Sequence, residues 1–469
     1  MPEKYHLKTQ PVPPRMPRVG KFGVVDWRED CARCHNCVKK ACVYDRYRHE
    51  AEYIRTLKDV DALYFDCMGC FSCVQSCTKD LLRLSVNPAY EALGNLYWTP
   101  EIIRTTWVQA ETAKIPVSGA GYPGPFSGPG FDSMWTDMSE IVRPTRDGIH
   151  GREYISTAVD IGKKPSFLSF AGNELANPDW PLVSIPMPLI LDLSSSQHTL
   201  PKLDPSIVET ASRTDLIALI DAASWPITGI DLDRCLPHIA FYMNPDGPPM
   251  PADILRKTRL AEIPDCMDVA ESIRKLKGMC PDIVIAVRVD LDANGVQRAI
   301  DLAGCDKVEV VHVVADLNGN EIGEDKPRFV KDMIRQIHTS LIESGKRDEV
   351  TIMAGGGIAL PEHMAKAIIC GADLVTVNLP LLIALECHLC SGCRPGMPCP
   401  AKLEQIDTGY AVGRMTNLIA AWHDQLIEVM GAMGMREVRR IRGDVGRAMF
   451  FEQLEEESFG KLFGIRRES

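Results

Sequence analysis

The sequence predicts an α/β fold in which buried parallel strands alternate with helices, joined to a small cysteine-rich unit. From about residue 180 onward, short apolar runs alternate with stretches of helical period, which is the pattern of a parallel sheet. Twelve of the 17 cysteines lie in three short runs. At 469 residues the chain also exceeds the length, about 250–300 residues, at which a single hydrophobic core stops growing.

Each element of this prediction rests on periodicity. Apolar runs suited to buried strands occupy residues 184–193, 239–243, 283–289, 308–314, 350–354 and 374–377. Helical stretches lie between or after them, at residues 267–279, 295–303, 327–344, 361–369, 413–434 and 444–457. The pattern by itself does not distinguish a closed (β/α)8 barrel from an open, doubly wound sheet.

The composition is that of a globular protein, with 45% hydrophobic and 25% charged residues. A formal charge of −11 argues against a nucleic-acid or anionic-membrane partner. The first residues contain no apolar segment of a secretory signal, and Asn378 and Pro380 interrupt the longest apolar stretch, so we expect no membrane insertion. We therefore expect a cytoplasmic protein with reduced thiols, in which clustered cysteines bind metal.

The first two cysteine runs each have the spacing C-x2-C-x2-C followed by a fourth cysteine. Three thiolates at this spacing bind one face of a 4Fe-4S cluster, and two-cluster ferredoxins take the fourth ligand from the other run. Zinc and disulfides are the alternatives, but zinc sites normally use paired hooks of two ligands. We expect two 4Fe-4S clusters, one on Cys31, Cys34, Cys37 and Cys77 and the other on Cys67, Cys70, Cys73 and Cys42.

The third run contains four cysteines within 13 positions and directly follows a predicted strand: Cys387, Cys390, Cys393 and Cys399. A third cluster is our interpretation, and a structural zinc knuckle is the alternative. The remaining cysteines stand alone among apolar or helical residues, so we expect them to be buried thiols: Cys235, Cys266, Cys280, Cys305 and Cys370.

Three consecutive glycines, Gly355, Gly356 and Gly357, connect one predicted strand to a helix. Glycines at such a position let backbone N–H groups approach a phosphate, and a helix N-terminus favours an anion. A tight turn without a ligand is the alternative. No catalytic residue is assigned, because Asp290, His312 and Asp316 at the strand ends are of types that more often form structural hydrogen bonds or salt bridges.

The order of these pieces resembles the FMN-binding barrel domain of glutamate synthases. The resemblance rests on the strand at 283–290, the strand and loop at 308–320, AGGG at 354–357, GADLVTVNLPLLIALEC at 371–387 and the cysteine run that follows. Together with the N-terminal cysteines, the arrangement is similar to the archaeal-type glutamate synthase large subunit. The resemblance implies a (β/α)8 TIM barrel that binds FMN, an N-terminal α+β ferredoxin-like domain and C-terminal helices.

The resemblance also implies cofactor-binding residues. The glycine turn at 355–357 corresponds to the family's FMN phosphate site, Asn378 lies in its second phosphate turn, and Met187 lies in the segment around its first strand. Arg288 stands where the family has a lysine that faces the flavin. The family's three-cysteine pattern holds a 3Fe-4S cluster, whereas Cys390 provides a fourth ligand here, so a 4Fe-4S cluster is an equal expectation.

These inferences define four segments: a ferredoxin-like domain at 1–95, a linker at 96–180, the FMN barrel with its cysteine run at 181–400, and a helical segment at 401–469. The predicted function is an oxidoreductase that passes electrons between the clusters and FMN and acts on a small-molecule substrate. The alternative is an electron-transfer subunit of a larger complex that does not form glutamate. Residues 1–60 hold 13 Lys and Arg against 8 Asp and Glu, which suits docking to an acidic redox partner.

Overall fold

The computed structural model describes the chain at residues 5–16, 19–26, 40–41, 43, 70–115, 128–136, 154–165, 169–175, 181–194, 203–244, 247, 249–265, 268–305, 307–390 and 399–460. The chain divides into two compact units. The first consists of residues 1–12, 105–387 and 398–469, and the second of residues 13–104 and 388–397.

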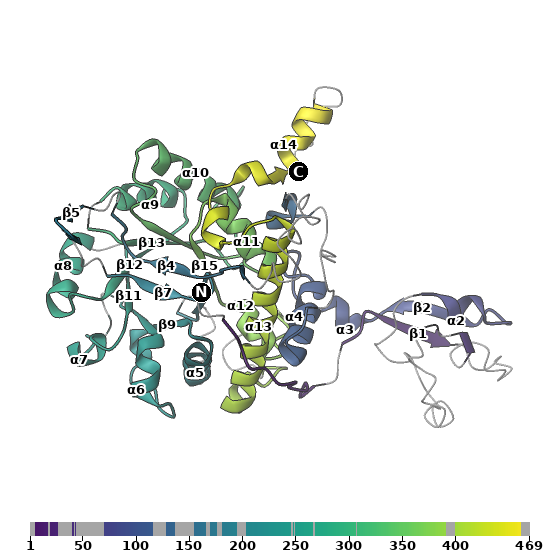
Figure 1. The fold of residues 1–469 in the computed structure, drawn as a ribbon. Helices are drawn as coiled ribbons and strands as arrows, with labels where there is room; N and C mark the ends of the chain where they lie inside the picture. Colours follow the sequence, from purple (N-terminus) through teal and green to yellow (C-terminus); the bar gives the residue numbers. More distant parts are fainter. Residues whose placement is uncertain are drawn as a thin grey trace. The chain divides into compact units, whose positions relative to one another are not determined.

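The first unit is built on a closed barrel of eight parallel strands, in the order β10-β11-β12-β13-β14-β15-β8-β9 (Figure 1). The pairing of β15 with β8, with Val375 opposite Leu189, closes it. The strands are β8 Leu189–Asp192, β9 Ile217–Asp221, β10 Ile239–Tyr242, β11 Leu260–Pro264, β12 Val284–Asp290, β13 Val310–Val314, β14 Thr351–Gly355 and β15 Leu374–Val377. This resolves the choice between barrel and open sheet, and the predicted (β/α)8 fold is confirmed.

Two barrel strands, β9 and β11, were absent from the sequence prediction, and one predicted strand was wrong in extent. Residues 184–193 form the end of β7 (Val183–Ile185) and β8, not one strand. Pro186 and Pro188 lie between them, and proline cannot donate to a strand ladder. β11 was missed because Glu262 interrupts its apolar run, a residue that the barrel nevertheless buries completely.

Helices lie outside the barrel strands: α5 Asp204–Thr214, α6 Leu232–Cys235, α7 Ala252–Leu255, α8 Val269–Met279, α9 Gly295–Ala303, α10 Val330–Glu343, α11 Pro361–Cys370 and α12 Leu379–Ala384. The long helix α13, Thr408–Ala432, packs against α5, α11 and α12. Among the described residues, no helix combines the length and apolar character needed to span a membrane.

The predicted helix at 444–457 is wrong over its first half. Ala448–Phe450 instead form strand β16, which pairs antiparallel with β3, Met134–Thr136, and only Phe451–Glu455 form the helix α14. The pairing partner lies more than 300 residues away, so local helical periodicity gave no sign of it. Two further antiparallel pairs join β4 Val159–Ile161 to β7, and β5 Phe170–Ala171 to β6 Glu174–Leu175.

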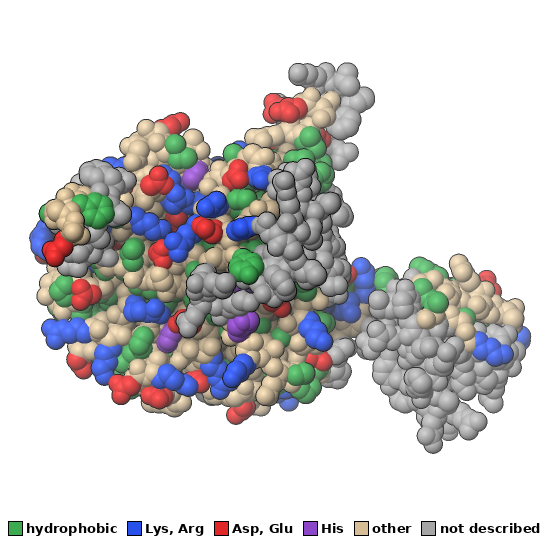
Figure 2. Space-filling view, in the orientation of Figure 1, with side chains coloured by type: hydrophobic (Ala, Val, Ile, Leu, Met, Phe, Trp, Pro, Cys, Tyr) green, Lys and Arg blue, Asp and Glu red, His purple; other side chains and the backbone are tan. Residues whose placement is uncertain are grey.

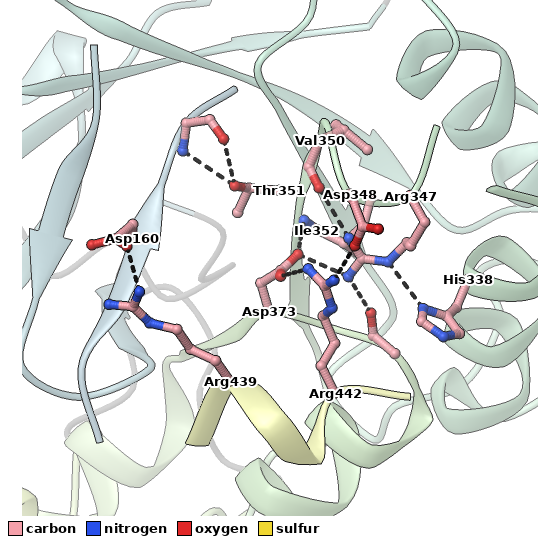
Figure 3. A network of polar contacts seen from close by, with 12 residues as sticks. Asp160, His338, Arg347, Asp348, Val350, Thr351, Ile352, Asp373, Arg439 and Arg442 are labelled. Atoms are coloured by element: carbon pink, nitrogen blue, oxygen red, sulfur yellow. Dashed lines mark hydrogen bonds and ion pairs between the residues drawn. The ribbon is translucent and has the colours of Figure 1, made fainter. Parts of the chain in front are cut away.

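A polar network closes the amino end of the barrel strands (Figure 3). Gly162, directly after β4, exchanges two hydrogen bonds with the Thr351 hydroxyl at the start of β14. Asp373, directly before β15, accepts from Arg347 at 2.8 Å and from Arg442 at 2.9 Å. Burial raises the pKa of Asp373, but the two guanidinium groups hold it below its ordinary value. Arg442 therefore ties the C-terminal segment to the barrel.

The second unit contains an antiparallel pair, β1 Phe22–Asp26 with β2 Leu82–Val86, and the short helices α2 Ser72–Gln75 and α3 Pro88–Glu91. Asn87 starts α3 by accepting from the Ala89 N–H, and its amide donates to Gly20 just before β1. One side chain thus links the segment before β1 to the start of α3. The helix α4, Pro100–Thr112, begins in this unit and ends in the first.

Candidate functional site

A chain of buried polar side chains crosses the interior of the barrel. The carboxylate of Glu262 on β11 accepts from Nδ1 of His312 on β13 at 2.8 Å. Nε2 of the same imidazole lies 3.1 Å from Oγ1 of Thr376 on β15. Because a carboxylate oxygen accepts, Nδ1 of His312 is the donor to Glu262, and Nε2 is left to pair with the Thr376 hydroxyl. Glu262 and His312 are 0% exposed and Thr376 is 3% exposed.

Arg288 on β12 extends this chain toward the carboxyl end of the strands. Its guanidinium lies 3.2 Å from Glu262 and 3.5 Å from Asp192 at the end of β8, and it donates to the Ser194 hydroxyl at 2.9 Å. The Tyr242 ring lies 5.2 Å from its central carbon. Burial lowers the pKa of Arg288, but the neighbouring Asp192 and Glu262 carboxylates leave it above its ordinary value. Two carboxylates thus flank this buried cation.

The three glycines of the predicted phosphate turn each lie against protein atoms. A Cβ on Gly355 would lie 2.4 Å from the Thr376 hydroxyl oxygen and 3.2 Å from Nε2 of His312, so this glycine makes room for their hydrogen bond. Gly356 and Gly357 have φ values of +94° and +68°, which strongly favour glycine. Their missing Cβ atoms leave space for the backbone of the loop that follows β13, including Gly319. Only backbone groups of this turn can contact a ligand.

The structure places most predicted FMN residues at one end of the barrel. Gly355 ends β14, Asn378 directly follows β15, and these strands are neighbours, while Arg288 lies near the end of β12. Asn378 is half-buried, and its side chain accepts from the Leu379 N–H at the start of α12. Met187 does not join them, because it precedes β8 and lies at the opposite, amino end of the strands.

The loop between β13 and α10 is held closed by its own contacts. Asp316 accepts from the backbone N–H groups of Asn318 at 2.9 Å and Asn320 at 2.7 Å. Further along, Arg328 forms an ion pair with Glu321. The loop therefore has a fixed shape at the carboxyl end of the barrel, next to the glycine turn. Asp316 has a structural role here.

Sequence reasoning missed Glu262 and Thr376, and assigned His312 no role. A carboxylate in the apolar run Leu260–Pro264 was the available signal, because a buried acid requires a partner. Thr376 gave no signal, since threonine is ordinary in a strand.

The described thiols of the second unit are suited to metal binding. Hydrogen bonds from the Ser72 side chain and backbone hold the pKa of Cys70 below its ordinary value. Burial raises the pKa of Cys77, but backbone N–H groups from Leu81 and its neighbours outweigh burial and lower it, with the Leu81 nitrogen 3.3 Å from the sulfur. A lowered pKa favours the thiolate, which is the form that binds metal. Cys73 is a buried thiol on α2 that forms no disulfide.

The third run is divided between the two units. Cys387 and Cys399 belong to the first, and Cys390 and Cys393 to the second. Where side chains are described, Cys387, Cys390 and Cys399 form no disulfide, and no three His, Cys, Asp or Glu side chains gather into a metal site. The other predicted ligands lie outside the described residues: Cys31, Cys34, Cys37, Cys42, Cys67 and Cys393. Soft thiol donors fit iron–sulfur or zinc binding equally.

Not all of the isolated cysteines are buried, as the sequence predicts them to be. Cys235, Cys280 and Cys370 are buried, as expected, and burial raises the pKa of Cys370 to about 12. Cys305 is exposed, which corrects the expectation for that residue, because it follows the last turn of α9 and not its buried face. Cys266 lies outside the described residues.

On the visible face of the barrel unit, basic and acidic side chains are interspersed (Figure 2). Within the described residues of that face, neither sign forms a continuous area. A surface of this kind lacks the basic stripe by which nucleic-acid-binding proteins contact phosphates.

The fold and the site define a (β/α)8-barrel protein with a polar barrel interior and a separate thiol-bearing unit. Residues 251–436 match the family model of the conserved region in glutamate synthase. The archaeal-type glutamate synthase (NADPH) of Dehalococcoides mccartyi is 24% identical, over 90% of this chain and 93% of that protein. The archaeal glutamate synthase (NADPH) of Archaeoglobus fulgidus is 21% identical, over 90% and 92%. The chain is thus similar to archaeal-type glutamate synthases over about 90% of its length, and the match to the conserved region in glutamate synthase lies at residues 251–436.

Solved structures similar to the barrel include a mandelate oxidase, with 13% identity, a TM-score of 0.38 and coverage of 66% of this chain and 97% of that chain. A flavocytochrome b2 has 12% identity, a TM-score of 0.41 and coverage of 67% and 79%.

Proposed function

We propose that the protein is an iron–sulfur flavoprotein oxidoreductase of the glutamate synthase type, in which electrons pass between cysteine-bound clusters and FMN in the barrel. The observation that carries the proposal is the extent of the glutamate synthase region, residues 251–436. That region contains β11 to β15, the glycine turn, the third cysteine run and α13. The proposed cofactor residues and the third cysteine run therefore all lie within it or, for Met187, upstream of it.

The carboxyl end of the barrel fits a phosphate-bearing flavin. The turn at Gly355–Gly357 presents backbone groups, and Asn378, directly after the neighbouring strand β15, carries an amide group, which together suit a phosphate. FMN, when bound, exchanges a hydride with a substrate and single electrons with clusters. Because Arg288 already pairs with Asp192 and Glu262, that residue would orient a bound group through hydrogen bonds and would not act as an unpaired cation.

The cysteine runs would hold two 4Fe-4S clusters in the ferredoxin-like unit and a third cluster, 4Fe-4S or 3Fe-4S, at Cys387–Cys399. The lowered pKa values of Cys70 and Cys77 support ligand roles in the clusters of the second unit. A redox partner, protein or nicotinamide, would supply the electrons, and a small-molecule substrate would receive them.

Anaerobic purification with flavin, iron, sulfide and zinc analysis tests the cofactor set. Three 4Fe-4S clusters require about twelve iron atoms per chain, with one FMN. Zinc without flavin would contradict the proposal. The same preparation is then supplied with 2-oxoglutarate, ammonia or glutamine, and a chemically reduced ferredoxin, and glutamate formation is measured.

Two observations favour a second function, an electron-transfer subunit of a larger complex. Arg288 already pairs with two carboxylates and the β13–α10 loop is closed on itself, so neither provides an obvious receptor for a substrate carboxylate. This function predicts the full cofactor set, electron transfer from reduced ferredoxin to the flavin, and no glutamate. Glutamate turnover by the isolated chain would exclude it.

A further inference from the structure

A short 3-10 helix, η3 Gly130–Ser133, packs against α10 and α11, two of the helices outside the barrel strands. Its two central residues, Phe131 and Asp132, are buried. The Phe131 carbonyl accepts from Nζ of Lys366 on α11 at 2.8 Å. Burial lowers the pKa of Lys366, although the carboxylates of Glu362 and Asp132 oppose that shift. A buried ammonium group thus fixes the backbone of η3 to α11.

His363, in the first turn of α11, connects η3 to the backbone that follows the glycine turn. Its Nδ1 accepts from the Ala359 N–H at 3.2 Å, so Nε2 carries a proton of the imidazole ring. Nε2 lies 3.5 Å from Oδ1 of Asp132, and the centroid of the His363 ring lies 5.1 Å from that of Phe131. His363 therefore contacts η3 on one side, and on the other it holds a backbone amide two residues after Gly357.

A second path of contacts joins η3 to the same turn through aromatic rings. The Phe131 ring packs edge-to-face on that of Phe329, with 5.1 Å between the ring centroids. A Cβ on Gly319 would lie 2.6 Å from the Phe329 ring and 3.2 Å from Cα of Gly357, so Gly319 fills the space between them. All four residues belong to the first unit. η3 therefore supports the glycine turn both through α11 and through the loop before α10.

The glycine turn needs this support because it can contact a ligand only through its backbone. Gly356 and Gly357 have positive φ values, and glycine loses more conformational freedom on folding than any other residue. Contacts that fix Ala359 on one side and Gly319 on the other therefore prearrange the N–H groups of the turn. Prearranged donors bind an anion more tightly, because less conformational entropy is lost when the anion binds.

We propose that Phe131, Asp132 and His363 are positioning residues for the glycine turn, and that their support lets the protein select a flavin with a phosphate over one without. The inference rests on the proposed function, because it takes the glycine turn as the phosphate site. η3 precedes residues 251–436, so this support comes from a part of the chain outside the glutamate synthase match. FMN and riboflavin differ by the phosphate, so the ratio of their affinities measures what the phosphate contributes.

The test measures the affinities of FMN and riboflavin for the full-length, flavin-free protein by flavin fluorescence. His363→Phe keeps a ring against Phe131 but leaves the buried Ala359 N–H without an acceptor, so FMN affinity should fall about tenfold and riboflavin affinity less than about twofold. His363→Asn places an amide oxygen near the position of Nδ1, so its FMN preference should stay within about threefold of the wild type. An unchanged ratio in His363→Phe, or equal losses for both flavins, would overturn the positioning role.

His338→Phe is the matched control. His338 is also buried and also accepts through Nδ1, from Nε of Arg347 at 2.9 Å, but it belongs to the network at the amino end of the barrel (Figure 3). The variant should lower the melting temperature and leave the ratio of FMN to riboflavin affinity unchanged. A ratio that falls as far in His338→Phe as in His363→Phe would overturn the proposal, because the effect would then not be local to the glycine turn.

Hydrogen exchange in the flavin-free protein tests the role of η3 without relying on flavin affinity or on the folding of His363→Phe. In Phe131→Leu, the amides of Ala359 and Val330 should lose protection, because their acceptors are His363 and the Gly319 carbonyl. The Ile352 amide, which donates to Asp373, should keep its protection.

Unchanged protection of Ala359 and Val330 in Phe131→Leu, or an equal loss at Ile352, would overturn the support by η3. Equal affinity of the wild type for FMN and riboflavin would instead contradict the phosphate site and with it the proposed function. That result is read from the wild type alone, so the two failures are distinguishable.

Discussion

Nδ1 of His312 lies 2.8 Å from the Glu262 carboxylate, and neither side chain has any exposed surface. The two residues come from β13 and β11, which are not neighbours in the barrel, because β12 with Arg288 lies between them. The contact therefore spans the barrel interior. It joins Thr376 on one side to the Arg288 guanidinium on the other, so that the position of each depends on the next.

Glu262→Gln should destabilise the barrel by about 3 kcal/mol, because Arg288 and the His312 N–H lose a buried, charged acceptor. The measurement is urea unfolding followed by circular dichroism. Asp233→Asn is the control, since Asp233 pairs with Lys257 on the surface and its loss should leave the unfolding free energy within error. A Glu262→Gln protein as stable as the control would show that the contacts of Glu262 with Arg288 and His312 do not contribute to the free energy of unfolding.

Gly355→Ala should cost about 1–3 kcal/mol, because its Cβ overlaps the Thr376 hydroxyl. In a Thr376→Ala background the overlap disappears and the cost should shrink, whereas in Thr376→Ser the hydroxyl remains and the cost should persist. A double-mutant cycle measures this coupling. Equal costs in both backgrounds would count against the packing explanation for this glycine.

Gly278→Ala is the control for the glycine substitution. Gly278 lies in α8 with nothing within 4 Å of an added Cβ, so alanine should stabilise the protein by about 0.5–1 kcal/mol.

In metal-free protein, Cys70 should react with iodoacetamide well before Cys235. Cys70 is exposed and its pKa is lowered by Ser72, whereas Cys235 is buried and burial raises its pKa. Peptide mass spectrometry over a time course gives the order. Reconstitution with iron and sulfide should then protect Cys70 and Cys77. Alkylation of Cys70 at an unchanged rate after iron loading would argue against its ligand role.

Stability should fall as the pH drops from about 6.5 to 4. Burial, with Arg347 and Arg442 nearby, lowers the pKa of His338 to about 4, and burial also lowers that of His423 to about 4. Between pH 4 and about 6.5, the unfolded chain binds protons that the folded chain does not. Proton binding therefore stabilises the unfolded state relative to the folded state. Above pH 6.5 neither histidine contributes.

His338→Gln should reduce this pH dependence by about one proton, because the amide oxygen can still accept from Arg347 without binding a proton. The check is the slope of unfolding free energy against pH. A slope equal to that of the wild type would assign the acid sensitivity to other groups.

Much of the barrel was predictable because its signals are local. β15 and α9 have the predicted bounds. A continuous apolar run specifies the strand and a regular helical period specifies the helix, and neither depends on contacts with distant residues. Glu262 shows the limit. A strand at β11 was not predicted, because a carboxylate interrupts the apolar run there. The partners that make its burial stable, Arg288 and His312, lie on other strands. The β3–β16 pair was missed for the same reason.

The sequence by itself determined the cysteine spacing, the alternation of strands and helices, and the glycine turn, because each depends on residues within about one element of each other. Only the tertiary structure decided that the sheet closes, that Gly355 leaves room for the contact of Thr376 with His312, and that Arg414 caps the end of α12. These depend on atoms brought together from distant segments. Burial makes such contacts strong enough to matter, and burial is a property of the folded chain.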